Sequence, residues 1–111
     1  MAFKVNLEDL EMKPHPKFKG VDIGFIVTKE KHPELSITIL RITKDTEIPL
    51  HTHEREVDSI FILEGEGEIY LNENWQKVKR GDVVVVGAGE VHGLRANETI
   101  KCYIVHAPAL W

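Results

Sequence analysis

The sequence predicts an all-β fold, organised as one small sandwich or barrel domain. From Val21 onward, short runs of β-branched and aromatic residues alternate with turn residues, which is the pattern of successive short strands. No stretch has the apolar periodicity of an amphipathic helix of useful length. The chain is 111 residues long, the size of a single domain. Because a flat sheet of this size would leave its edges and one face uncovered, we expect the strands to close into a barrel.

The first twenty residues are predicted to form an N-terminal arm, with residues 21–111 as the barrel domain. The arm is rich in charge, and two prolines flank His15, a composition that favours an extended chain over a packed helix. Residues 6–12 have room for one helical turn at most. We expect the arm to contact a second copy of the chain.

Seven runs within residues 21–111 are predicted to be strands, because each is short, apolar and bounded by turn residues. They cover residues 21–28, 35–43, 57–63, 67–71, 75–78, 83–86 and 100–105. The loop between the first two contains His32-Pro33, which interrupts strand pairing. The sequence Asn72-Glu73-Asn74 is predicted to form a hairpin tip, because asparagine tolerates positive φ.

Composition and charge argue against nucleic-acid and membrane partners. The net charge is -4 and the basic residues are dispersed, so the field of the protein does not favour polyanions. Apolar residues make up 42% of the chain, as in soluble proteins, and no apolar run approaches the roughly 20 residues of a membrane-spanning helix. Cys102 has no second cysteine to pair with, and the amino terminus lacks the apolar core of a signal peptide. We therefore expect a cytoplasmic protein.

Histidine placement predicts a metal site. His51 and His53 form an i, i+2 pair, and in a strand such side chains point to the same face. His92 follows a glycine-rich stretch where a sharp turn can bring the chain back across the sheet, and Asp58 offers a carboxylate just before an apolar strand. An isolated His-x-His pair is more often two solvated or hydrogen-bonded side chains, so the spacing to later residues decides between the two interpretations.

A cluster of neutral imidazoles with one carboxylate suits one divalent transition metal ion: Fe, Mn, Co, Ni or Zn. Thiolate is not available unless Cys102 faces inward, which argues against softer ions such as Cu(I). With four protein ligands at most, an octahedral ion keeps two positions for water or a substrate.

These residues resemble the two sequence motifs of the cupin superfamily. The first cupin motif reads G-x5-H-x-H-x3-4-E-x6-G, and the chain has His51-x-His53, four residues, Asp58, six residues and Gly65. The second reads G-x5-P-x-G-x2-H-x3-N, and the chain has Gly81, five residues, Gly87-x-Gly89, two residues and His92. The resemblance covers about residues 35–106, and the fifteen residues between Gly65 and Gly81 are similar to the connection in compact single-domain cupins.

The resemblance implies a single-domain jelly-roll β-barrel that holds a metal ion between the two motifs. The ligands it implies are His51, His53, His92 and the acidic residue Asp58. Because Asp58 stands where the family has the longer glutamate, Glu56 is kept as the alternative acidic ligand.

Several other side chains have two interpretations. Ile60 and Ile62 share the strand face of Asp58 and are expected to line the barrel interior. His106, at the end of the last predicted strand, is either a proton donor at the barrel mouth or a rim histidine without a role. His15 and His32 adjoin prolines and are expected at the surface.

The fold alone does not decide the chemistry, so three functional hypotheses remain. The first is a metal-dependent oxidoreductase of the dioxygenase type that acts on a small organic substrate. The second is a metal-dependent isomerase or lyase for a sugar or keto acid, which needs a proton shuttle such as His106 or Glu56 near the ion. The third is a binding protein for a small molecule or metal. A homodimer is expected in each case, because an all-β domain of this size has edge strands to cover.

Overall fold

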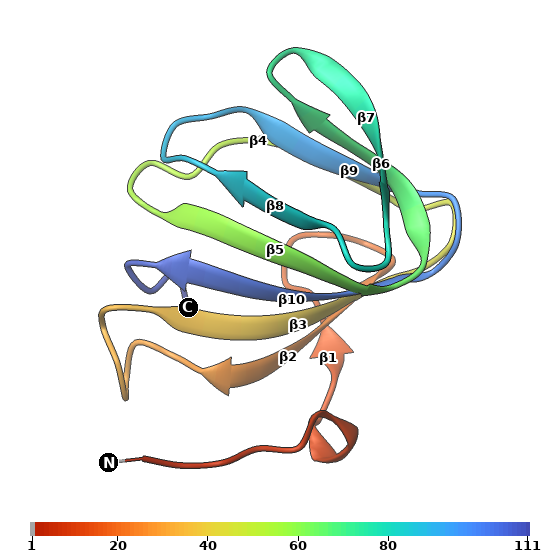
Figure 1. Ribbon diagram of the computed structural model, residues 1–111. Coiled ribbons are helices and arrows are strands. Elements are labelled where there is room, and N and C mark those ends of the chain that lie inside the picture. The colour runs from red at the N-terminus through yellow and green to blue at the C-terminus, as the bar shows by residue number, and fades with distance from the viewer. Residues whose placement is uncertain (1) are drawn as a thin grey trace.

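The computed structural model describes residues 2–111 and shows a jelly-roll β-barrel built from two antiparallel sheets (Figure 1). One sheet has the strand order β1-β2-β3-β10-β5-β8, and the other has the order β4-β9-β6-β7. The strands are β1 (Lys13–Pro14), β2 (Val21–Val27), β3 (Ser36–Ile42), β4 (Glu47–His51), β5 (Val57–Glu64), β6 (Glu66–Leu71), β7 (Asn74–Lys79), β8 (Val83–Val86), β9 (His92–Ala96) and β10 (Ile100–Ala107). The predicted all-β, single-domain barrel is confirmed.

The seven predicted runs match seven of these strands, each to within two residues at both ends. Three strands were not predicted: β1, β4 and β9. Strand β4 contains Pro49 and β9 contains Gly93, and neither carries a β-branched run, so their local sequence does not indicate a strand. They form because they pair with each other, and β4 tolerates a proline because it is the edge strand of its sheet.

The core lies between the two sheets and is made of the inward-facing residues of each strand. In β5, Asp58, Ile60 and Ile62 are buried while Val57 and Phe61 on the other face are exposed, so the predicted inward position of the two isoleucines is confirmed. The apolar core also includes Val21, Ile23, Leu40, Ile42, Ile48, Ile69, Val78, Val84, Val86, Leu94, Ala96, Ile100, Cys102 and Ile104.

The N-terminal segment runs along its own barrel (Figure 1). It contains the short 3-10 helix η1 (Leu7–Asp9), and β1 then pairs with the outer edge of β2. Leu10 and Met12 cover the outer face of β2 at Gly24, which is buried; a Cβ atom there would lie 2.6 Å from the Leu10 side chain. Phe18 packs against the core. Within residues 2–111, no helix is long and apolar enough to cross a membrane.

Candidate metal centre

The pairing of β4 with β9 places His51 directly opposite His92. The centroids of their rings lie 4.2 Å apart. His53 follows two residues later, with its ring centroid 5.1 Å from that of His51 and 5.3 Å from that of His92. One ring nitrogen from each of the three histidines lies within 4.8 Å of the others. The two motifs therefore do bring their three imidazoles to one point.

The prediction that His51 and His53 share one strand is wrong, because β4 ends at His51. His53 lies in the following loop, where its carbonyl oxygen accepts a hydrogen bond of 2.8 Å from the backbone N–H of Gly89. This bond joins the first motif to the glycine-rich loop before His92. The loop contact, and not strand alternation, positions the second imidazole.

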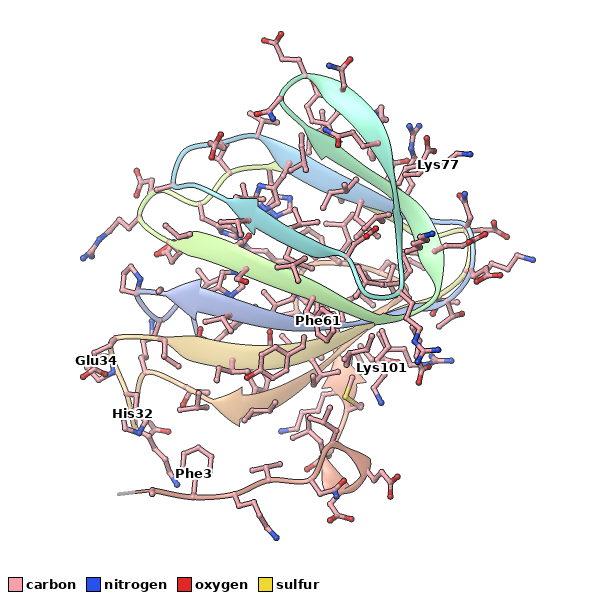
Figure 2. The ribbon with its side chains drawn as sticks, viewed as in Figure 1. Phe3, His32, Glu34, Phe61, Lys77 and Lys101 are labelled. Carbon is pink, nitrogen blue, oxygen red and sulfur yellow. The ribbon has the colours of Figure 1, made fainter. Side chains whose placement is uncertain are left out.

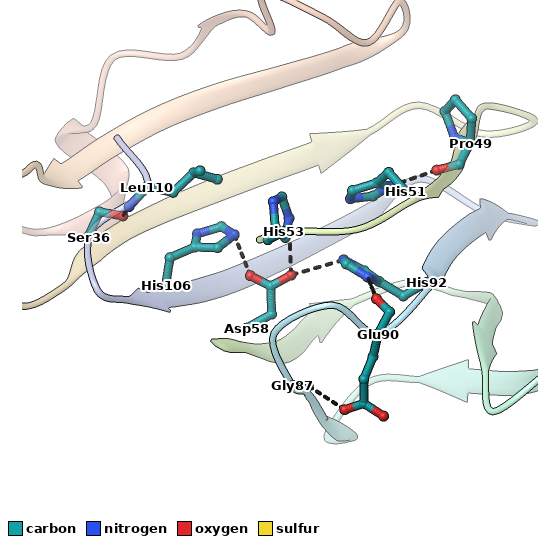
Figure 3. Close-up of polar contacts among 10 residues, drawn as sticks. All are labelled: Ser36, Pro49, His51, His53, Asp58, Gly87, Glu90, His92, His106 and Leu110. Carbon is teal, nitrogen blue, oxygen red and sulfur yellow. Dashed lines mark hydrogen bonds and ion pairs between the residues drawn. The ribbon is translucent and has the colours of Figure 1, made fainter. Parts of the chain in front are cut away.

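Asp58 lies among the histidines because β5 and β10 pair with Asp58 opposite His106. Its Oδ2 atom is 3.0 Å from Nε2 of His92 and 3.4 Å from Nε2 of His53 (Figure 3). Its Oδ1 atom contacts Nε2 of His106 on the other side. Both side chains are buried, with Asp58 3% and His106 6% exposed. One carboxylate thus connects the three-histidine cluster with a fourth, buried histidine.

Of the two acidic candidates, Asp58 is the one that lies in the cluster. Glu56 precedes β5, is partly exposed and is absent from both groups of converging donor atoms, which are His51-His53-His92 and His53-Asp58-His106. Asp58 reaches the histidines in spite of its shorter side chain, because it lies within a strand whose inner face is buried. Glu56 was expected to share a strand face with Asp58. Strand β5 begins at Val57, so Glu56 lies outside it.

Backbone carbonyl groups fix the orientation of two of the imidazoles. Nδ1 of His51 lies 2.7 Å from the carbonyl oxygen of Pro49, and Nδ1 of His92 lies 3.1 Å from that of Glu90. Because a carbonyl oxygen only accepts, each Nδ1 carries a hydrogen, so Nε2 is the nitrogen that keeps the lone pair when the ring is neutral. Metal-binding histidines in proteins are oriented in this way by a second hydrogen bond.

The residues present fit a divalent transition metal ion. A carboxylate oxygen that faces the lone pair of an imidazole nitrogen is repelled unless a proton or a cation lies between them. The 3.0 Å and 3.4 Å separations of Asp58 Oδ2 from Nε2 of His92 and His53 also suit a shared ion, since ligand atoms roughly 2.1 Å from one ion lie roughly 3 Å apart at right angles. Three nitrogen donors and one oxygen donor match the ions expected from the sequence.

The electrostatics of the centre favour the metal-binding protonation states of His51, His53 and Asp58, whereas His92 must release a proton before its Nε2 binds metal. Burial lowers the pKa of both His51 and His53, so these rings are neutral at neutral pH. Burial would also lower the pKa of His92, but its hydrogen bond with Asp58 and that with the Glu90 carbonyl raise it overall. Burial acts to raise the pKa of the Asp58 carboxyl, yet the contacts with His106 and His92 hold it well below its usual range. Asp58 is therefore an anion.

A cavity of about 420 Å³ lies in front of the cluster, and its walls are mostly apolar. The walls include His15, Phe18 and Trp111, which join the arm and the C-terminal tail to the site. His15 stacks on Phe18 with ring centroids 4.6 Å apart and meets Trp111 edge-on at 5.5 Å.

The expectation that His15 lies at the surface is wrong, because the arm turns inward after β1 and half-buries it. The side chain of His32 is 43% exposed, in agreement with the expected surface position.

Comparison with known proteins supports the same fold. A family model described as a cupin domain matches residues 38–107. L-ectoine synthase from Marinomonas sp. is 29% identical over 87 residues, which cover 77% of this chain and 67% of that protein. The L-ectoine synthase from Halomonas elongata is 31% identical over 78 residues, which cover 68% of this chain and 56% of that protein.

A solved structure of an RmlC-like cupin from Shewanella frigidimarina has the same fold, with a TM-score of 0.85 and 18% sequence identity. The match covers 99% of this chain and 94% of that one.

Proposed function

The chain belongs to the cupin family, and from this premise we propose that it is a metal-dependent isomerase or lyase that moves protons on a small organic substrate. Three observations support the proposal: the convergent histidines, the apolar cavity in front of them, and the buried contact between Asp58 and His106. The contact is the observation that carries it, because this class of reaction needs an acid-base group beside the ion.

In the proposed site, His51, His53, His92 and Oδ2 of Asp58 would hold the ion. A divalent ion bound there would act as a Lewis acid on a carbonyl oxygen of the substrate. Oδ1 of Asp58 forms a close ionic contact with Nε2 of His106, which fixes the direction of that ring and favours the hydrogen on Nε2. His106 lines the cavity, and its Nδ1 atom has no partner among the described residues. His106 would therefore take a proton from the substrate and return it.

The curated relatives are compatible with this class of reaction. Both carry the name of a synthase, although this chain spans only 67% and 56% of their lengths. We accordingly assign the class of chemistry and not their product.

A dioxygenase reaction is the second candidate, because the nitrogen and oxygen donors also suit iron or manganese and leave coordination positions open. It makes no use of the contact between Asp58 and His106, so we rank it below the proton-transfer reaction. A binding protein without turnover would retain the cavity and the ion but show neither activity.

The first test is metal analysis of the purified protein. We expect about one divalent ion per chain, and its loss in His92→Ala. His32→Ala is the matched control, since the His32 side chain is partly solvent-accessible and lies outside the cluster. Equal metal content in both variants would contradict the site.

The second test follows proton exchange by NMR, with the metal-loaded protein and a panel of small keto acids and ketoses in D2O without oxygen. We expect deuterium to enter the substrate next to its carbonyl group, and the exchange to fall at least about 100-fold in His106→Ala. Oxygen uptake without proton exchange would favour the dioxygenase. Ligand binding with neither reaction would indicate the binding protein.

A further inference from the structure

Three buried polar atoms that line the cavity have no hydrogen-bond partner among residues 2–111: Oγ1 of Thr38, Oδ1 of Asp58 and Nδ1 of His106. Oδ1 of Asp58 still has an ionic contact with Nε2 of His106, whereas within the same residues no such contact is found for Oγ1 of Thr38 or Nδ1 of His106. Thr38 is 1% exposed and His106 is 6% exposed, so neither group is freely hydrated in bulk solvent. Buried polar groups in native proteins are nearly always paired, and a pair of unpaired ones in one cavity wall indicates a site for a ligand group.

The strand register places Thr38 and His106 on the same face of adjacent strands, with Ser36 directly opposite His106. Thr38 in β3 lies opposite Ile104 in β10, and His106 is two residues farther along β10. Residues two apart in a strand share a face, so His106 is a diagonal neighbour of Thr38 on the inner face of the barrel. Both residues line the cavity in front of the histidine cluster.

A third side chain on the same strand face shows that Thr38 is unusual. Ser36 is also buried, but its hydroxyl oxygen accepts hydrogen bonds from the backbone N–H groups of Leu110 at 3.0 Å and Trp111 at 3.4 Å. The Ser36 hydroxyl thus ties the C-terminal tail to the barrel. The hydroxyl of Thr38, two residues away, has no comparable structural task.

The tautomer of His106 decides which ligand group fits. Because Nε2 of His106 faces the carboxylate of Asp58, that nitrogen carries the hydrogen and Nδ1 presents a lone pair. The ligand group must therefore donate to Nδ1. The hydroxyl of Thr38 can donate to the same group or accept from it. A ligand hydroxyl can donate to His106 while it accepts from Thr38, and so satisfies both atoms.

We propose that Thr38 and His106 form a subsite for a hydroxyl group, and that the substrate is a small hydroxylated carbonyl or carboxylic compound. This inference rests on the proposed function, because it names the substrate class of the same site. One end of the compound faces the histidine cluster, and its hydroxyl lies between Thr38 and His106. The remaining walls, such as Leu40, Ile60 and Ile104, contact its apolar frame.

The binding test uses rigid probes that differ only at the hydroxyl position. Calorimetric titration of the metal-loaded protein compares 3- and 4-hydroxybenzoate with benzoate and with the corresponding methoxybenzoates, which cannot donate. We expect at least one hydroxybenzoate to bind about tenfold more tightly than benzoate and its methoxy analogue. In Thr38→Val the preference should fall to about threefold or less, while the affinity for benzoate is unchanged.

The stability test needs neither a metal ion nor a ligand. Because the Thr38 hydroxyl has no protein partner, Thr38→Val should leave the melting temperature of the free protein unchanged or raise it. Ser36→Ala is the matched control and should lower the melting temperature, since it removes the acceptor for Leu110 and Trp111. If Thr38→Val lowers the melting temperature as much as Ser36→Ala does, the Thr38 hydroxyl has a structural role, and the subsite proposal is overturned.

The two proposals fail in different ways. Equal affinity for hydroxylated, methoxylated and plain probes, or no binding of any hydroxybenzoate at millimolar concentration, would overturn the subsite even if proton exchange is observed. A hydroxyl preference that Thr38→Val abolishes, without any proton exchange, would support the subsite and reject the proposed reaction.

Discussion

At the scale of single residues, the centre depends on the two oxygens of Asp58 facing different partners. Oδ2 lies toward His53 and His92, and Oδ1 lies toward His106. The sequence motif indicated the first set of contacts, because the acidic residue falls near the family position. It did not indicate the second set, because His106 becomes a neighbour of Asp58 only through the pairing of β5 with β10.

Asp58→Asn should lower the affinity for a divalent ion at least about tenfold, because the amide is neutral and only one of its ends can accept. The measurement is competition titration with a chromophoric chelator. Glu56→Gln removes the same charge two residues away and should leave the affinity nearly unchanged. If the two variants lose equal affinity, the effect is one of net charge and Asp58 is not a ligand.

The buried thiol of Cys102 predicts a pH dependence of stability. Burial raises its pKa from 9.0 to about 12. A raised pKa in the folded state means that the contribution to stability is complete below pH 9 and is lost as the pH rises from about 9 toward 12. The free energy of unfolding should therefore fall by up to about 1.4 kcal/mol per pH unit in that window.

Urea denaturation at pH 8, 9 and 10 measures the slope. Cys102→Ala should be less stable at pH 8 because of the smaller side chain, yet it should show a shallower decline above pH 9. Parallel declines in the two proteins would mean that other groups cause the whole effect.

At the scale of strands and turns, local chemistry accounts for most of what the sequence predicts. The hairpin tip between β6 and β7 was expected at Asn72-Glu73-Asn74, and the structure has positive φ at Asn72 (50°) and Glu73 (69°) with Asn74 opening β7. Strands β4 and β9 could not be predicted in this way, because the pairing of Ile48 with Leu94 stabilises both of them and is not local in the sequence. The His51–His92 pair depends on those two strands.

Two glycines with nearly the same positive φ should differ in their tolerance of a side chain. Gly65 joins β5 to β6 with φ at 88°, and a Cβ atom there would lie 2.2 Å from the carbonyl oxygen of Thr99. Gly81 lies between β7 and β8 with φ at 92°, and no atom lies within 4 Å of its Cβ position. Gly81→Ala should cost about 1 kcal/mol of stability from backbone strain alone.

Gly65→Ala adds a backbone collision to the same strain, so we expect a cost of about 2–4 kcal/mol. Denaturant unfolding of both variants provides the comparison. If both variants lose a similar free energy of unfolding, the backbone near Thr99 moves aside easily. The connection from one sheet to the other at Gly65 is then not rigid.

At the scale of the whole molecule, the cavity wall is built from more than the two sequence motifs. The N-terminal arm and the C-terminal tail also contribute to it. Phe18 and Trp111 both pack against the core, and Phe25 meets Trp111 edge-on with ring centroids 5.5 Å apart. The tail is also tied to the barrel through Ser36. Residues of the arm and of the tail therefore shape the cavity, which the motif spacing alone did not indicate.

The outer face of the six-stranded sheet has an apolar surface beside a free edge. Strand β8 is the last strand of that sheet, and its Val83 and Val85 are 62% and 65% exposed. Val83 lies opposite Phe61 of β5, which is 39% exposed and faces outward in Figure 2. A second copy that presents the same edge would cover these residues by a twofold pairing of β8 with β8.

Light scattering after gel filtration should therefore show a homodimer. Val85→Lys places a charge at the centre of the proposed contact and should shift the protein to a monomer with an unchanged β-sheet spectrum, because an unpaired buried charge opposes association. Gln76→Lys adds the same charge at an exposed position of β7 in the other sheet and should leave the dimer intact. A wild-type monomer, or a dimer that Val85→Lys does not affect, would mean that this edge is not the contact between copies.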